Sequence, residues 1–142
     1  MTNSILERKV VSLSVKSKKH NRNAFKALIG LVIRSKQRLE HRKLQLAQIA
    51  NEHFDVFVRI QAEEHLAKQM KLIRIADELI SKIKSALKIS SHQQMTQHEL
   101  IQQYFEELDI LNFMEFEVAK KYFSFIHDYY QPKVIPINSV AA

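Results

Sequence analysis

The residues best suited to chemistry form one face of a predicted helix, where Arg34, Arg38 and His41 recur at i, i+4 and i+7. This spacing places the three side chains together, opposite an apolar stripe. Arginine and lysine neutralise phosphates and release their counterions, so a nucleic-acid backbone matches this face. The candidate residues for contacts with nucleic acid or an acidic partner are Lys16, Lys18, Lys19, Arg22, Lys26, Arg34, Arg38 and His41.

Positive charge is concentrated in the first third of the chain. Residues 1–43 carry twelve Lys and Arg against two acids, a net charge of +10. Residues 44–142 carry ten against thirteen, a net charge of −3. Such asymmetry indicates a partner of opposite charge, either a nucleic acid or an acidic protein surface. The acidic part of the same chain is the alternative partner.

Two lysines, Lys36 and Lys43, fall within the apolar stripe of the same helix. Their aliphatic stems can cover apolar surface while the ammonium groups reach solvent. Alternatively, the ammonium groups meet acids on another helix. The candidate acids are Glu99, Glu106, Glu107, Asp109, Glu115 and Glu117.

The residues that would carry metal or catalytic chemistry are poorly arranged. Glu–His pairs occur at 40–41, 52–53 and 64–65. Their spacing is about 18 Å along a helix, whereas the ligands of one metal ion must converge. Cysteine is absent, and a single glycine cannot build a phosphate-binding loop. Ser90, Ser91 and His92 share a loop, but nothing nearby orients them as nucleophile and base. We expect a non-enzymatic protein without metal or cofactor.

Aromatic side chains gather between residues 113 and 130. Phe116, Phe123 and Tyr130 share one helical stripe, which we assign to the core. The remaining aromatic residues and a methionine do not fit that face. They indicate either a helix buried on two sides or an interface with another protein or a second copy. The candidate interface residues are Phe113, Met114, Phe125 and Tyr129.

The elements that must position these side chains are helices. One glycine and two prolines leave little material for tight turns, while 46% apolar residues suffice for a core. Phe25, Val32, Leu39 and Leu46 recur every seven residues, and a rotated stripe follows a break between residues 51 and 64. We predict an all-α fold, a helical bundle of about four helices. One or two of these are long, and short extended N- and C-terminal tails flank them.

Local signals set the predicted boundaries. Thr96 and Glu99 form a capping box that starts one helix, and Asn112 offers an N-cap for a last helix ending near Gln131. The alternating segment Val10–Val15 matches a strand template, but it has no evident strand to pair with.

Residues 1–142 are interpreted as a single helical domain, with residues 1–20 as a basic, extended lead-in and residues 132–142 as an extended tail. No apolar run has the length of a signal peptide or a membrane span, so we expect a cytoplasmic protein. Two function classes fit these observations. The first is a non-enzymatic protein that binds nucleic acid through phosphates. The second is an adaptor, secretion chaperone or inhibitor that binds a larger protein complex through basic and aromatic helix faces.

Overall fold

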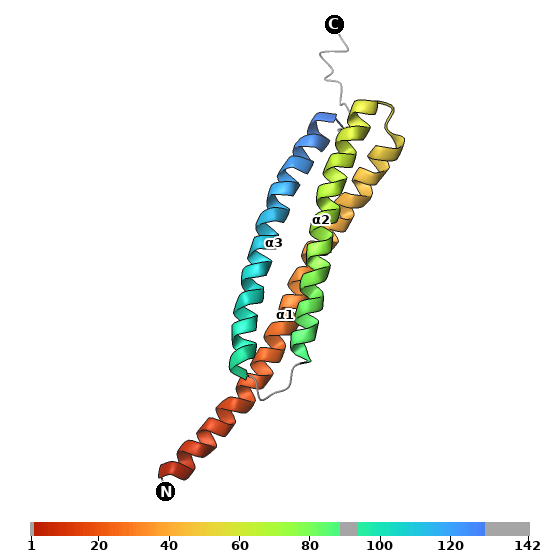
Figure 1. The fold of residues 1–142 in the computed structure, drawn as a ribbon. Helices are drawn as coiled ribbons and strands as arrows, with labels where there is room; N and C mark the ends of the chain where they lie inside the picture. Colours follow the sequence, from red (N-terminus) through yellow and green to blue (C-terminus); the bar gives the residue numbers. More distant parts are fainter. Residues whose placement is uncertain (1, 89–93, 130–142) are drawn as a thin grey trace, which may run out of the picture.

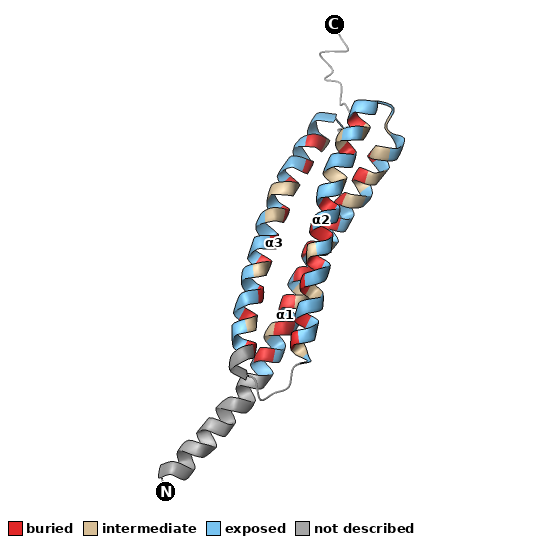
Figure 2. Ribbon diagram, viewed as in Figure 1, coloured by how far each residue is buried: buried red, intermediate tan, exposed pale blue. Residues whose placement is uncertain are grey.

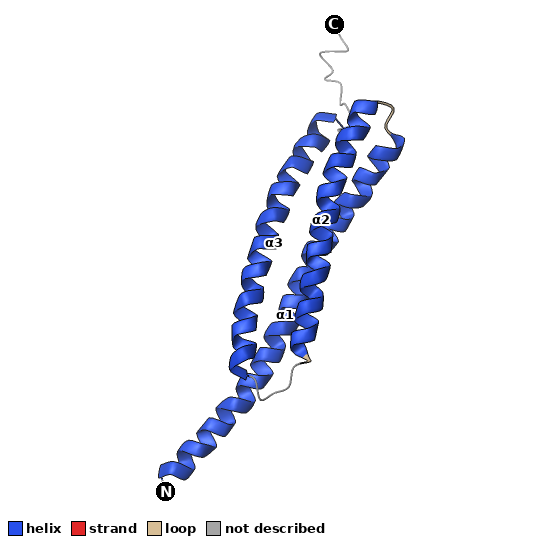
Figure 3. Ribbon diagram, viewed as in Figure 1, coloured by secondary structure: helices blue, strands red, loops and turns tan. Residues whose placement is uncertain are grey.

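The computed structural model describes the backbone of residues 2–88 and 94–129, and the side chains of residues 19–88 and 97–129. These ranges form three helices: α1 (Thr2–Glu52), α2 (Val56–Leu87) and α3 (Gln94–Tyr129). The helices lie side by side, and α1 continues beyond the other two at its N-terminal end (Figure 1). Helix is the only regular element in the described ranges (Figure 3). The all-α bundle is confirmed, with three helices in place of about four.

The N-terminal segment differs from its prediction. Since α1 begins at Thr2, the extended lead-in is wrong, and Val10–Val15 is part of the helix. A lone strand would leave its backbone groups without partners, whereas a helix pairs them internally. The C-terminal tail, residues 132–142, lies outside the described residues.

A short turn, residues 53–55, separates α1 from α2 and confirms the predicted break. Asp55 is the N-cap of α2: its Oδ1 accepts a hydrogen bond from the Phe57 amide at 2.9 Å. The Asp55 amide in turn donates to Nδ1 of His53 at 3.0 Å. These bonds pair polar groups at the helix end that would otherwise need water.

The apolar stripe of α1 lies in the core as predicted, because Phe25, Val32, Leu39 and Leu46 are at most 1% exposed. Buried residues recur along all three helices (Figure 2). They form two clusters. The larger one contains the buried apolar residues between Phe25 and Leu39 of α1, between Leu72 and Ala86 of α2, and between Ile101 and Leu111 of α3. The smaller one lies toward the α1–α2 turn and contains Leu46, Ile49, Val58, Ala62, Tyr122 and Phe125.

The helix α3 is continuous, which explains why the predicted count of four was too high. Asn112, expected to begin a fourth helix, lies inside α3 and accepts a hydrogen bond from the Ser35 hydroxyl at 2.9 Å. This bond occupies the side chain that would otherwise cap a helix. The start of α3 at Gln94 also places Thr96 in its first turn instead of before it. The predicted end near Gln131 lies outside the described residues.

The buried face of α3 differs from the predicted one at its aromatic residues. Leu111, Tyr122 and Phe125 are buried, whereas Phe116 and Phe123 are 59% and 61% exposed. The assignment of Phe116 and Phe123 to the core was therefore wrong. Both the set with Leu111 and the set with Phe116 recur at helical spacing. Packing of α3 against α1 and α2 buries the set with Leu111.

Side-chain contacts fix the directions of the helices. Ser35 and Arg38 of α1 bond to Asn112 and Glu115 of α3, so these two helices run parallel. Contacts from α1 to α2 join Lys36 to Asp77 but Arg42 to Gln69, so α2 is antiparallel to α1. In the described part of the chain, no helix carries an apolar stretch that would cross a membrane.

His65 of α2 packs against α3, with its ring centroid 5.0 Å from that of Phe125. Its Nδ1 is buried, and no described residue forms a hydrogen bond with it. Burial is the main cause that lowers the pKa of His65, and the positive charges of Lys68 and Lys121 lower it further. The negative charge of Glu64 acts in the opposite direction.

We predict that this histidine makes the protein less stable in mild acid. Because the pKa of His65 is lower in the folded chain than in the unfolded chain, the unfolded chain binds the proton first. The contribution of His65 to the free energy of unfolding is complete above the ordinary histidine pKa of about 6.5. It is lost as the pH falls from there toward the lower pKa that His65 has in the folded chain. The measurement is the free energy of unfolding between neutral pH and mild acid. In the variant His65→Gln, the free energy of unfolding should depend less steeply on pH. An equally steep dependence would contradict the role given to His65.

Candidate nucleic-acid interface

The basic helix face is partly neutralised by acids of the same chain. Lys36 Nζ lies 2.7 Å from Asp77 Oδ1 of α2 and 3.6 Å from Glu40 Oε1. The hydrogen bond with Asp77 is the main cause that raises the pKa of Lys36. Lys36 thus meets an acid on another helix, although Asp77 was not among the candidate acids.

A polar layer joins α1 to α3 through Arg38. Its Nε donates to Glu115 Oε1 at 2.6 Å, and its Nη2 donates to the Ser35 hydroxyl at 3.1 Å. The same hydroxyl donates to Asn112 Oδ1 at 2.9 Å. Arg38, assigned by sequence to a solvent-facing phosphate site, therefore also fixes the position of α3.

Arg42 extends this layer to α2. Its Nε donates to Gln69 Oε1 at 3.2 Å, and both side chains are buried. Its Nη2 lies 3.4 Å from Glu115 Oε2, close enough for charge attraction but without hydrogen-bond geometry. The layer lies between the two apolar clusters of the core. One buried carboxylate, Glu115, is thus shared by two arginines.

Most of the α1 cations whose side chains the structure describes have no acidic partner among the described residues. Eight Lys and Arg residues lie between residues 19 and 43, and Lys36, Arg38 and Arg42 are the ones paired with acids in the described part of the chain. The other five are Lys19, Arg22, Lys26, Arg34 and Lys43. All of these except Lys43, which is half-buried, are exposed. The side chains of Lys16 and Lys18 lie outside the described ones.

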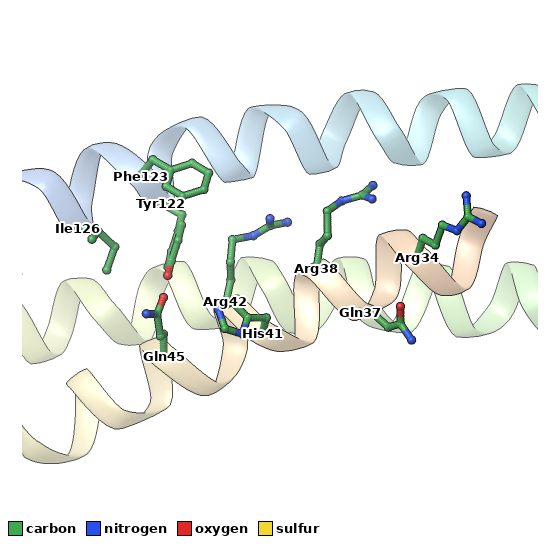
Figure 4. Close-up of a pocket in the computed structure, with 9 residues that line it drawn as sticks. All are labelled: Arg34, Gln37, Arg38, His41, Arg42, Gln45, Tyr122, Phe123 and Ile126. Carbon is green, nitrogen blue, oxygen red and sulfur yellow. The ribbon is translucent and has the colours of Figure 1, made fainter. Parts of the chain in front are cut away.

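A groove of about 810 Å³ runs between α1 and α3 beside the polar layer. In Figure 4, Arg34, Arg38 and Arg42 extend from α1 toward α3, and Phe123 lies on α3 toward the Arg42 end of the groove. The residues that line the groove are Arg34, Gln37, Arg38, His41, Arg42, Gln45, Tyr122, Phe123 and Ile126. One wall is thus cationic and rich in amides, and the other is aromatic and aliphatic.

The ring of Phe123 contacts a neighbouring aromatic ring on one side and is exposed to solvent on another. Its ring centroid lies 5.1 Å from that of Tyr122, and the two rings meet at 69°. Tyr122 is buried, which anchors this contact in the core, while Phe123 is 61% exposed. An exposed aromatic ring in a groove that also holds arginines can accept a second flat ring.

The structure brings together part of the site predicted from sequence. Arg34, Arg38 and His41 line the groove with Gln45, whereas Lys26 lies outside it. Sequence reasoning missed Arg42 and the whole α3 wall. Arg42 had a signal, because it stands three residues after Leu39 and four before Leu46, in the buried stripe of α1.

The four candidate interface residues of α3 do not share one surface. Phe125 is 4% exposed and belongs to the smaller core cluster, and Met114 packs against the larger one. Phe113 and Tyr129 are 66% and 43% exposed. Only these two present large surfaces to a partner.

Comparison with protein families, curated proteins and solved structures finds no match for this chain. Among the described residues, His, Asp and Glu side chains form no group of three that could hold a metal ion. The proposal that follows therefore depends on the geometry of the groove and of the exposed face of α1.

Proposed function

We propose that this protein is a non-enzymatic nucleic-acid-binding protein that contacts phosphates through α1. The observation that supports this most directly is a set of cations on α1 that pair with no acid among the described residues. Lys19, Arg22, Lys26 and Arg34 are exposed and make no ion pair with any described residue. A cation without an intramolecular acid retains its full attraction for an external anion.

The spacing of these cations suits an extended polyanion. From Lys19 to His41 the helix rises about 33 Å at 1.5 Å per residue. Exposed amides of Asn23 and Gln37 lie along the same stretch and can donate to sugar and phosphate oxygens. Contacts of this kind bind the backbone of any sequence, so we expect little discrimination between bases.

The test is a fluorescence-anisotropy titration with unrelated duplex and single-stranded oligonucleotides at near-physiological salt. We expect dissociation constants below roughly 100 μM, the weak limit of non-specific binding. Affinity should fall steeply with salt, because each neutralised phosphate releases counterions. Reversing three free cations together, Arg22→Glu, Lys26→Glu and Arg34→Glu, should abolish binding to every sequence alike. Arg38 is left unchanged because it also holds Glu115.

A matched control separates local contacts from net charge. The variant Lys71→Glu, Arg74→Glu and Lys84→Glu reverses three exposed cations of α2, none of which pairs with an acid in the described residues. It should retain most of the affinity. If neither kind of oligonucleotide binds better than roughly 100 μM, or if both triple variants lose binding equally, the proposal is wrong.

A second candidate function is an adaptor that binds a larger protein or a second copy of itself. Its support is the exposed apolar surface of α3, which soluble monomers usually keep small. The exposed residues are Phe105, Ile110, Phe113, Phe116 and Phe123. An acidic protein that competes with the oligonucleotides, and binds more tightly, would favour this function.

A further inference from the structure

We infer that the groove between α1 and α3 binds an unpaired base, so that the protein prefers single-stranded nucleic acid. This inference depends on the proposed function and adds the class of ligand. Phosphate contacts along α1 would serve a duplex as well as a single strand. The groove adds the exposed ring of Phe123, on which only a strand with accessible bases can stack a base.

The first argument is the combination of side chains across the groove. Arg34, Arg38 and Arg42 approach from α1, and Phe123 and Ile126 form the opposite wall (Figure 4). A nucleotide has an anionic phosphate joined to a flat ring, and such a groove meets both parts at once. Proteins that bind single strands without sequence preference combine a cationic groove with aromatic side chains in this way.

The second argument is the charge balance of the groove. Three arginines stand against one carboxylate, since Arg38 and Arg42 share Glu115 and Arg34 has no acid partner among the described residues. The groove therefore keeps a net positive charge. It attracts a phosphate without the cost of displacing an existing ion pair.

The third argument is the state of Phe123. This phenylalanine is 61% exposed, although burial of an aromatic ring is favourable. Its edge-to-face contact with the buried Tyr122 holds it beside the groove. A base stacked on Phe123 would cover this ring, and the amide of Gln45, which lies beside Tyr122 in Figure 4, would be in the same part of the groove.

The groove also has the size that a nucleotide requires. Its volume of about 810 Å³ falls in the range of small-molecule pockets, roughly 300–1,000 Å³. A duplex keeps its bases stacked inside, so it cannot place one against Phe123 without unpairing.

The experiment compares three probes with the full chain: an oligothymidine strand of about twelve nucleotides, a strand of the same length with abasic sugars, and the corresponding duplex. We expect the oligothymidine to bind most tightly. Phe123→Ala should weaken its binding by about 5- to 100-fold, the usual effect of removing one stacked aromatic ring. The same variant should leave binding of the abasic strand unchanged, and Phe123→Tyr should restore the affinity.

The control is Phe113→Ala, which removes an equally exposed ring of α3 that does not line the groove. It should not change any of the three affinities. If all probes bind equally and Phe123→Ala has no effect, the inference fails while the phosphate-binding function remains. If none of the probes binds, both fail. Preferential binding of an acidic, tyrosine-containing peptide over the oligothymidine would also overturn the inference.

Discussion

The variant Glu115→Ala should lower the free energy of unfolding by about 3–5 kcal/mol, the usual cost of removing one partner of a buried ion pair. The side chain of Glu115 is 9% exposed and that of Arg42 is 7% exposed. Without the carboxylate, Arg42 would keep a buried charge, with Gln69 as its hydrogen-bond acceptor among the described residues. Domains of this size have about 5–15 kcal/mol of stability, so the variant should be marginally folded. Chemical denaturation followed by circular dichroism measures the change.

Two further variants test whether the buried charge is responsible. Asp77→Ala breaks the more exposed pair with Lys36, which water screens, and should cost far less than Glu115→Ala. The double variant Arg42→Met and Glu115→Leu removes both buried charges and should recover most of the stability lost by Glu115→Ala. If Glu115→Ala costs no more than Asp77→Ala, the polar layer does not contribute as described.

Leu111→Ala should destabilise the protein by about 2–5 kcal/mol, because it removes a fully buried side chain from the larger core cluster. Phe116→Ala, on the same helix, should stay within about 1 kcal/mol. Its ring is 59% exposed, and Lys120 Nζ lies over it, 5.6 Å from the ring centroid. The pair of variants, measured by thermal or chemical denaturation, identifies the buried face of α3. A larger loss for Phe116→Ala than for Leu111→Ala would mean that α3 is rotated relative to this structure.

Much of the fold could be predicted from the sequence, because the signals involved are local. The seven-residue recurrence from Phe25 to Leu46 identified the buried face of α1, and a change in the direction of the stripe located the turn before α2. The aromatic residues that face inward in the second half of α3 could not be found in this way. Two apolar sets, one with Leu111 and Tyr122 and the other with Phe116 and Phe123, fit a helix equally well.

The choice between these sets depends on contacts between distant residues. Ser35 and Arg38 match Asn112 and Glu115 only when the Leu111 set faces inward. The candidate site was predicted in part for the same reason. The cations of α1 were found by spacing, but the wall around Phe123 comes from another helix and carries no local signal of its role.

The parallel alignment of α1 and α3 has a consequence for how the chain folds. Arg42 and Gln69, which join α1 to α2, are 27 positions apart, whereas the hydrogen bonds from Ser35 and Arg38 to α3 span 77. Closing the longer loop costs roughly 1 kcal/mol more in chain entropy. We expect the α1–α2 hairpin to form first and α3 to dock last. The groove is then assembled in the final step and opens in the first step of unfolding. A ligand bound there would hold α3 in place and slow the hydrogen exchange of its amides.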